Sequence, residues 1–267
     1  MSQFDESAGG RPTSRWKDEL ALAFLFLTRL PLYRLIGNID VSDRPLMSSA
    51  WAFGLVGIVV GAVGGIAYWF AVTLGLPNGA AALIALAAST VVTGALHEDG
   101  LADVADGFGG GSDLESKKRI MRDSRIGSYG VLVLIFAIGL KAATLGAIGD
   151  PELVFSALIA SHAIARGVLP AIANRFELAR GDGLGSSAGR PDTQGALFGL
   201  GIATGIAVIA LPAGIGLAAA LVGLGAAMVV AVLAKQQIGG LTGDVYGAAE
   251  QMAEVAALLT ITAYLAG

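Results

Sequence analysis

The chain has 267 residues, of which 55% are hydrophobic and 14% are charged, with a mean hydropathy of +0.72 and a net charge of −4. Soluble domains carry about a quarter charged residues, so this chain has too little polar surface to cover a soluble core, and lipid must solvate much of it. The absence of cysteine excludes disulfides, thiolate metal sites and cysteine nucleophiles, and the presence of only two histidines argues against a multi-histidine zinc site.

In chain order, a polar N-terminus precedes a series of apolar segments. We expect residues 1–15 to be flexible and residues 16–267 to form one integral membrane domain. Residues 18–36 are apolar but contain Arg29, Pro31 and Arg34. We therefore expect an interfacial or re-entrant helix there, with a further span as the alternative.

Seven later stretches predict an all-α, polytopic helical bundle with about seven transmembrane helices. Each approaches the ~20 residues that a helix needs to cross the hydrocarbon. They cover residues 50–76, 79–96, 128–148, 151–172, 195–212, 213–234 and 247–266.

The basic residues predict an orientation. If the N-terminus lies in the cytoplasm, 15 of the 17 Lys and Arg residues lie on the cytoplasmic side, either before the first span or in the loops after the second, fourth and sixth spans. The other two, Lys141 and Arg166, lie inside spans. The opposite connections are short and carry none. This positive-inside pattern places every long loop in the cytoplasm and the C-terminus on the far side.

An acidic cluster follows the second predicted span. Asp99, Asp103 and Asp106 are spaced at i, i+4 and i+7, so they share one face if that span continues as a helix. Three carboxylates this close repel each other, which a bound cation would relieve. Oxygen ligands favour a hard ion such as Mg²⁺. A solvated acidic helix face is the alternative.

A basic segment comes next, from Lys117 to Gly127, and carries five cations. Together with a metal on the acidic cluster, these cations would suit a phosphate-rich substrate. The alternative is a patch that binds anionic lipid. The glycines between residues 107 and 111 predict a flexible stretch whose backbone amides could approach phosphate.

Further ionisable groups lie toward the C-terminal half. We expect Asp244 and Glu250 to point toward the same site as Asp99, because ionisable groups in a span face the protein interior or a wet cavity. His162 and Arg166 are spaced at i, i+4, and a functional role or a structural pairing with Glu250 or Glu254 both stay open. Lys141 is expected only to snorkel.

These segments resemble a known family, cobalamin synthase, or adenosylcobinamide-GDP ribazoletransferase. The similarity lies in H-x-D-G-L-A-D-x-x-D-G at 97–107, M-x-D-S-R-I-G-x-x-G at 121–130 and T-G-D-x-x-G-A at 242–248. T-R-L-P at 28–31 and G-D-G-L-G at 181–185 also look like family segments.

The resemblance implies that adenosylcobinamide-GDP is joined to α-ribazole or its 5′-phosphate, with release of GMP, at the cytoplasmic (inner) membrane and with Mg²⁺. It implies small-molecule corrinoid and ribazole substrates, contact with membrane lipid and with other corrinoid-pathway proteins, and no nucleic-acid partner.

On this basis, we assign roles to individual residues. Asp99, Asp103 and Asp106 would hold Mg²⁺, and Arg125 would stabilise phosphate oxygens. His97 and Asp244 are both candidates for the general base. The expected substrate-binding residues are Arg29, Lys118, Arg122, Asp123, Ser124, Arg166, Thr242 and Glu250.

Two other functions are considered. In a CDP-alcohol phosphotransferase, an Ala-Arg pair follows the D-G element, whereas Ala102 here precedes Asp103. A cation-coupled transporter would use the acids within the spans. The surface position of the acidic cluster and the absence of a predicted broken span argue against it.

Overall fold

The computed structural model describes residues 15–31, 44–179 and 189–265. The expected flexible terminus, apart from Arg15, and the motif at 181–185 lie outside these ranges. The described residues form helices, with one isolated bridge between Leu178 and Leu241. The helices are α1 (Arg15–Leu27), η1 (Leu46–Ala52), α3 (Phe53–Thr73), α4 (Asn78–Thr93), α5 (Leu96–Gly110), α6 (Leu114–Met121), α7 (Ser128–Ile148), α8 (Pro151–Gly167), α9 (Leu169–Arg175), α11 (Thr193–Ala210), α12 (Ala213–Ile238) and α13 (Gly243–Leu265).

The all-α membrane architecture is confirmed, although the number of clearly apolar spans is lower than expected. In the described part of the chain, five segments are long and apolar enough to cross a membrane, or six if the bent pair α4 and α5 counts as one. The expected span at 247–266 forms most of α13, which carries ionisable side chains and does not meet this criterion. The five are Leu46–Thr73, Ser128–Ile148, Pro151–Arg175, Thr193–Ala210 and Ala213–Ile238.

The chain bends sharply between α4 and α5. The two helices make an angle of 94°, and both linking residues are left-handed, Gly94 with φ 68° and Ala95 with φ 58°. The condition that the helix continues unbroken from residue 79 through the acidic cluster is therefore not met, and the absence of a broken span, used above against a transporter, does not hold for this pair. The cluster lies on a separate helix, α5.

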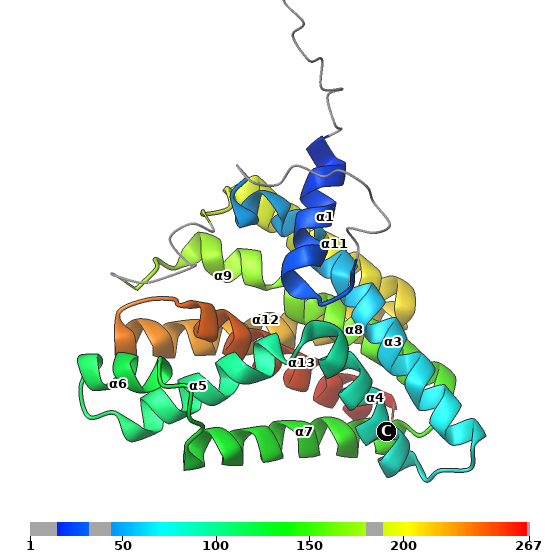
Figure 1. Cartoon of the computed structure of the whole chain (residues 1–267). Coiled ribbons are helices and arrows are strands. Elements are labelled where there is room, and N and C mark those ends of the chain that lie inside the picture. The colour runs from blue at the N-terminus through cyan, green and yellow to red at the C-terminus, as the bar shows by residue number, and fades with distance from the viewer. Residues whose placement is uncertain (1–14, 32–43, 180–188, 266–267) are drawn as a thin grey trace, which may run out of the picture.

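Small residues allow the helices to pack closely. A Cβ on Gly57 would lie 2.4 Å from the His162 carbonyl oxygen, and one on Gly61 would lie 2.5 Å from that of Leu158. This four-residue spacing brings the backbones of α3 and α8 together, as small residues do in membrane helix pairs. Helix α13 lies in the middle of the bundle and packs against α5, α7, α8 and α12 (Figure 1).

Helix α1 packs against η1 and α3. Its 13 residues extend about 20 Å at 1.5 Å per residue, less than the ~30 Å of hydrocarbon. The described part of residues 18–36 therefore does not form a further span. Trp51 on η1 donates a hydrogen bond from Nε1 to Glu19 at 2.9 Å, which ties α1 to the entrance of α3.

Candidate functional site

Helices α5 and α13 bring together carboxylates that are far apart in the sequence. Burial and the negative charge of its neighbours raise the pKa of Asp103 to about 7. Those neighbours are, in order of effect, Asp99, Asp244 and Asp106. Helix α5 lies outside the five apolar spans, and Asp244 occupies the first turn of α13. The expected convergence of Asp244 with Asp99 is therefore present, and the site favours a bound positive charge.

The two helices approach each other through glycine. A Cβ on Gly100 would lie 2.7 Å from the Asp244 carbonyl oxygen, and one on Gly247 would lie 3.1 Å from the His97 carbonyl oxygen. The hydroxyl of Thr242 accepts a hydrogen bond from the backbone N–H of Val245 at 3.3 Å. Thr242 thus stabilises the start of α13 next to Asp244.

Asp106 has a structural contact that the sequence did not reveal. Its carboxylate accepts hydrogen bonds from the backbone N–H groups of Gly127 at 2.7 Å and Gly130 at 2.9 Å. These are N–H groups at the start of α7, which lack partners within the helix. Asp106 therefore fixes the loop that contains Ser124 and Arg125 next to the end of α5. Its role as a metal ligand stays a prediction.

The basic segment is helical only as far as Met121, the last residue of α6. Helix α6 begins with a capping box in which the Asp113 carboxylate accepts from Ser116 N–H. A shallow surface hollow along α6 is lined by Glu115, Lys118, Arg119, Arg122 and Asp123. The glycine stretch before it is helical as far as Gly110, so the expected flexibility there was wrong.

Arg125 is exposed and pairs with its neighbour. Its Nε and NH2 groups donate to the two carboxylate oxygens of Asp123 at 3.0 and 2.7 Å. This contact lowers the pKa of Asp123 to about 2. Exposed pairs of this kind are weak, so the contact with Asp123 does not hold the Arg125 guanidinium firmly in place. Ser124, between them, is also exposed.

Arg29 lies at the bend between α4 and α5. Its backbone N–H donates to the Val92 carbonyl at 2.7 Å, and a Cβ on Gly94 would lie 2.6 Å from its Nε atom. The T-R-L-P segment therefore covers the bend that directs α5 away from α4.

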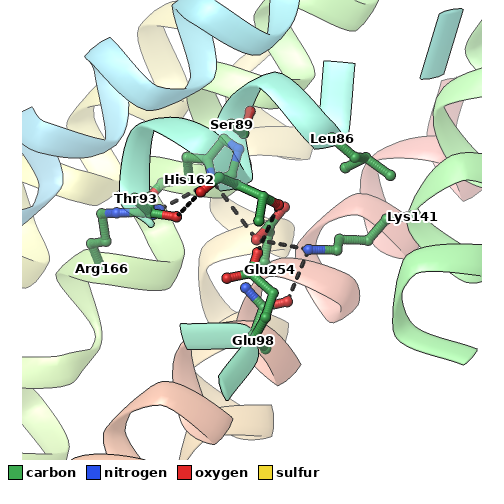
Figure 2. A pocket seen from close by; sticks show the side chains of 10 residues that line it. Leu86, Ser89, Thr93, Glu98, Lys141, His162, Arg166 and Glu254 are labelled. Carbon is green, nitrogen blue, oxygen red and sulfur yellow. Dashed lines mark hydrogen bonds and ion pairs between the residues drawn. The ribbon is translucent and has the colours of Figure 1, made fainter. Parts of the chain in front are cut away.

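A ring of buried polar side chains lies beneath the carboxylates. Arg166 contacts Glu250 at 2.7 Å and His162 Nδ1 at 3.1 Å. His162 faces Glu254 at 3.7 Å, and Lys141 contacts Glu254 at 3.2 Å. Gln251 closes the ring, because it accepts from Lys141 at 2.9 Å and donates to Glu250 at 3.0 Å. Figure 2 shows Lys141 from α7 and His162 from α8 converging on Glu254, with Arg166 beside His162 on α8.

His97 connects this ring to α5. Its Nδ1 lies 3.6 Å from a Glu250 oxygen, and both side chains are buried. Arg166 and Glu250 expose 1% and 0% of their surface, so they bind each other and do not present groups to a substrate. For His162 and Arg166, the structure therefore favours structural pairing with Glu250 and Glu254 over a functional role, the two alternatives that the sequence left open.

The expected role of Lys141 was wrong. Its side chain is 4% exposed and ends between Gln251 and Glu254, so it does not snorkel. Sequence position alone could not indicate its partner, which lies on another helix. His162, Glu250 and Glu254 also have ligand atoms within 4.8 Å of one another. Because Arg166 and Lys141 already compensate both carboxylates, this trio is a poor site for a divalent metal.

Comparisons with known proteins complete the description of the site. Residues 19–262 match the sequence model of the family described as cobalamin-5-phosphate synthase. An adenosylcobinamide-GDP ribazoletransferase of Bradyrhizobium diazoefficiens is 42% identical over 249 residues, which cover 93% of this chain and 95% of that protein. The protein of that name from Mesorhizobium japonicum is 42% identical over 248 residues, covering 93% and 94%. The one from Azorhizobium caulinodans is 36% identical over 257 residues, covering 94% and 97%. No solved structure matches this chain.

Proposed function

Because this chain belongs to the cobalamin-5-phosphate synthase family, we propose that it is an adenosylcobinamide-GDP ribazoletransferase like its named relatives. In the reaction, a hydroxyl of α-ribazole or its 5′-phosphate attacks the phosphorus attached to the corrinoid, and GMP leaves. The observation that carries the proposal is the meeting of Asp99 and Asp103 on α5 with Asp244 on α13.

The donor set of this site fits Mg²⁺. Its carboxylates are hard oxygen ligands, and their mutual repulsion and partial burial, seen in the raised pKa of Asp103, favour a cation. Asp99 and Asp103 would hold the ion. Asp106 would contribute only by sharing an oxygen that already accepts a backbone N–H. When bound, Mg²⁺ would supply positive charge that neutralises diphosphate oxygens.

The protein's own groups would orient the substrates. Arg125, with Lys118 and Arg122 on the α6 hollow, would hold phosphate oxygens by charge-assisted hydrogen bonds. His97 and Asp244 remain the candidates to accept the proton of the attacking hydroxyl. His97 follows the bend between α4 and α5, and the backbone of Asp244 on α13 lies against Gly100, three residues further along α5.

We also propose that the protein is a multi-pass protein of the cytoplasmic (inner) membrane, with α6 on the cytoplasmic side. The distribution of basic residues supports this orientation. Large apolar side chains are exposed on the spans, among them Phe136 and Ile209, as expected for surfaces that contact lipid.

The test is a GMP-release assay. Purified protein in detergent with lipid would be incubated with adenosylcobinamide-GDP and α-ribazole 5′-phosphate, with Mg²⁺ or with EDTA. We expect Mg²⁺-dependent GMP and corrinoid product from wild type. We expect a loss of at least about 100-fold in folded Asp103→Asn, since one metal-binding carboxylate is removed.

Glu152→Gln is the matched control, because Glu152 is an exposed carboxylate in the first turn of α8. It should retain full activity. No product from folded wild-type protein would refute the transferase assignment. Full activity in EDTA, or in Asp103→Asn, would refute the role of the metal.

A further inference from the structure

A cleft of about 420 Å³ lies between η1 and the segment that leads into α11, with Glu19 of α1 at its edge. This volume falls within the roughly 300–1,000 Å³ of small-molecule pockets. The two sides are held together because α11 packs directly on η1, where a Cβ on Gly199 would lie 3.1 Å from the Ala50 carbonyl oxygen. The wall includes Pro45, Ser48, Trp51, Arg190, Pro191 and Asp192.

Hydrogen bonds fix one side of the cleft on α9. Arg190 donates from Nε to the Asn174 carbonyl at 3.1 Å and from NH2 to the same oxygen. Asn174 in turn donates from Nδ2 to the Pro191 carbonyl at 3.1 Å. These contacts use two of the three guanidinium nitrogens, so the third can donate to a ligand in the cleft.

Polar groups on the wall differ in whether they already have partners. Ser48 Oγ is buried and makes no hydrogen bond, which is costly and indicates a ligand with a polar atom. Asp192 Oδ1 accepts from the Gly195 N–H at 2.7 Å, whereas its Oδ2 bonds to no described residue. The indole of Trp51 donates to Glu19 at 2.9 Å, so the ring is held in place and offers its apolar surface.

This combination of groups fits a guanine base. Guanine carries two neighbouring donors, N1–H and the amino group, which a carboxylate such as Asp192 can accept together, and its O6 accepts from a cation such as Arg190. Adenine would turn the lone pair of its N1 toward the carboxylate. The benzimidazole base of α-ribazole has no N–H once it is joined to ribose. A site built to accept from donors rejects analogues that lack them.

The cleft also lies on the correct side of the carboxylate site. Helix α9 packs against α11 and against α12 and α13 (Figure 1). Burial raises the pKa of Tyr246 to about 12, and the charge of Arg190 opposes this rise, so Arg190 lies close to the first turn of α13, which carries Asp244. The guanine of the donor is separated from the attacked phosphorus by a ribose and one phosphate, so its subsite must lie near the carboxylates but apart from them.

We propose that this cleft binds the guanine of the donor substrate. Asp192 accepts from N1–H and the amino group, Arg190 donates to O6, and the ring packs on Trp51. The inference rests on the proposed transferase function, because the donor of that reaction carries GDP. Asp192 and Arg190 therefore determine nucleotide specificity and do not take part in the chemical step.

The experiment is equilibrium binding of GMP, AMP and xanthosine 5′-monophosphate to the full chain in detergent with lipid, by calorimetry and without corrinoid. We expect wild type to bind GMP at least about tenfold more tightly than AMP, because hydrogen bonds to a charged group are strong.

Asp192→Asn is the decisive variant. Its amide oxygen can still cap α11, and its acceptor and donor match N1–H and O2 of xanthine. We expect GMP affinity to fall about tenfold and xanthosine 5′-monophosphate to become the preferred ligand, a gain that misfolding cannot produce. The KM for adenosylcobinamide-GDP should rise with little change in kcat, as for a group that binds ground state and transition state alike.

Two further variants complete the set. Asp150→Asn is the matched control, because Asp150 caps α8 through the N–H groups of Glu152 and Leu153, and it should bind all three nucleotides like wild type. Ser48→Ala removes a hydroxyl that has no partner. It should therefore leave the unfolding midpoint unchanged and weaken GMP binding about threefold.

The outcomes separate the subsite from the transferase assignment. Equal affinities for GMP and AMP would overturn the subsite even if the protein forms the corrinoid product. A folded Asp192→Asn protein that does not favour xanthosine 5′-monophosphate would overturn it as well. Selective GMP binding with the reversed preference in Asp192→Asn, but without any corrinoid product, would support the subsite and refute the transferase.

Discussion

Gly100 on α5 packs directly against the backbone of Asp244 on α13, so that a Cβ at Gly100 would lie 2.7 Å from the Asp244 carbonyl oxygen and 3.0 Å from its Cα. The contact is between backbone atoms, which cannot move aside as a flexible side chain would. It sets the separation of two helices that carry the carboxylates of the site, Asp99, Asp103 and Asp106 on α5 and Asp244 on α13.

Gly100→Ala should therefore push α5 and α13 apart. We expect a loss of about 1–3 kcal/mol in stability from overpacking, and a larger fall in GMP release than this destabilisation alone would cause. The control is Gly225→Ala on α12, where a Cβ would meet nothing within 4 Å. Equal activity in the two variants would show that the helix separation is unimportant.

Asp106→Asn should lower stability even in the absence of metal. The variant keeps one acceptor but loses the charge and one of the two hydrogen bonds to the start of α7. Loss of a cap of this type costs about 1–2 kcal/mol. Thermal unfolding in EDTA measures the effect.

Asp103→Asn provides the contrast with Asp106→Asn. It relieves the repulsion among the carboxylates. The free energy of unfolding in EDTA should therefore stay unchanged or rise by up to about 1 kcal/mol. A stable Asp106→Asn protein that loses only activity would instead indicate that Asp106 acts mainly as a metal ligand.

Much of the carboxylate site could be predicted from the sequence because charged residues are rare in this chain. Asp99, Asp103 and Asp244 stand out against apolar surroundings, and their motifs mark them further. The helix register of the acidic cluster is also present, within α5. These features are local, so spacing alone was informative.

Other features depended on the three-dimensional arrangement. Gly94 and Ala95 resemble ordinary residues of an apolar helix, yet both adopt left-handed conformations and form a 94° bend. Asp106 accepts from Gly127, 21 residues away in the sequence, and Lys141 contacts Glu254, 113 residues away. The spacing of residues within a single helix cannot predict such contacts. The sequence showed that Lys141 was an unusual charge in a span but not which carboxylate compensates it.

Lys141→Met tests that compensation. It leaves Glu254 in a buried environment without its cation, and breaking one partner of a buried pair costs about 3–5 kcal/mol. We expect low yield and a much lower unfolding midpoint. The double variant Lys141→Met with Glu254→Gln removes both charges and should recover most of the loss. A single variant as stable as wild type would show that Lys141 is not needed to neutralise the ring.

Gly94→Ala tests the bend itself. Gly94 has φ 68°, a left-handed conformation that costs an alanine about 1–2 kcal/mol, and the new methyl group would meet the Arg29 side chain at 2.6 Å. The Arg29 side chain is flexible and can move aside, so the backbone term should dominate the loss in stability. Gly79→Ala on the same helix is the control, because nothing lies within 4 Å of its Cβ position.

If the bend orients α5, Gly94→Ala should also raise the Mg²⁺ concentration needed for half-maximal GMP release, whereas Gly79→Ala should not. An unchanged Mg²⁺ requirement in a destabilised Gly94→Ala protein would separate the bend from the geometry of the carboxylate site.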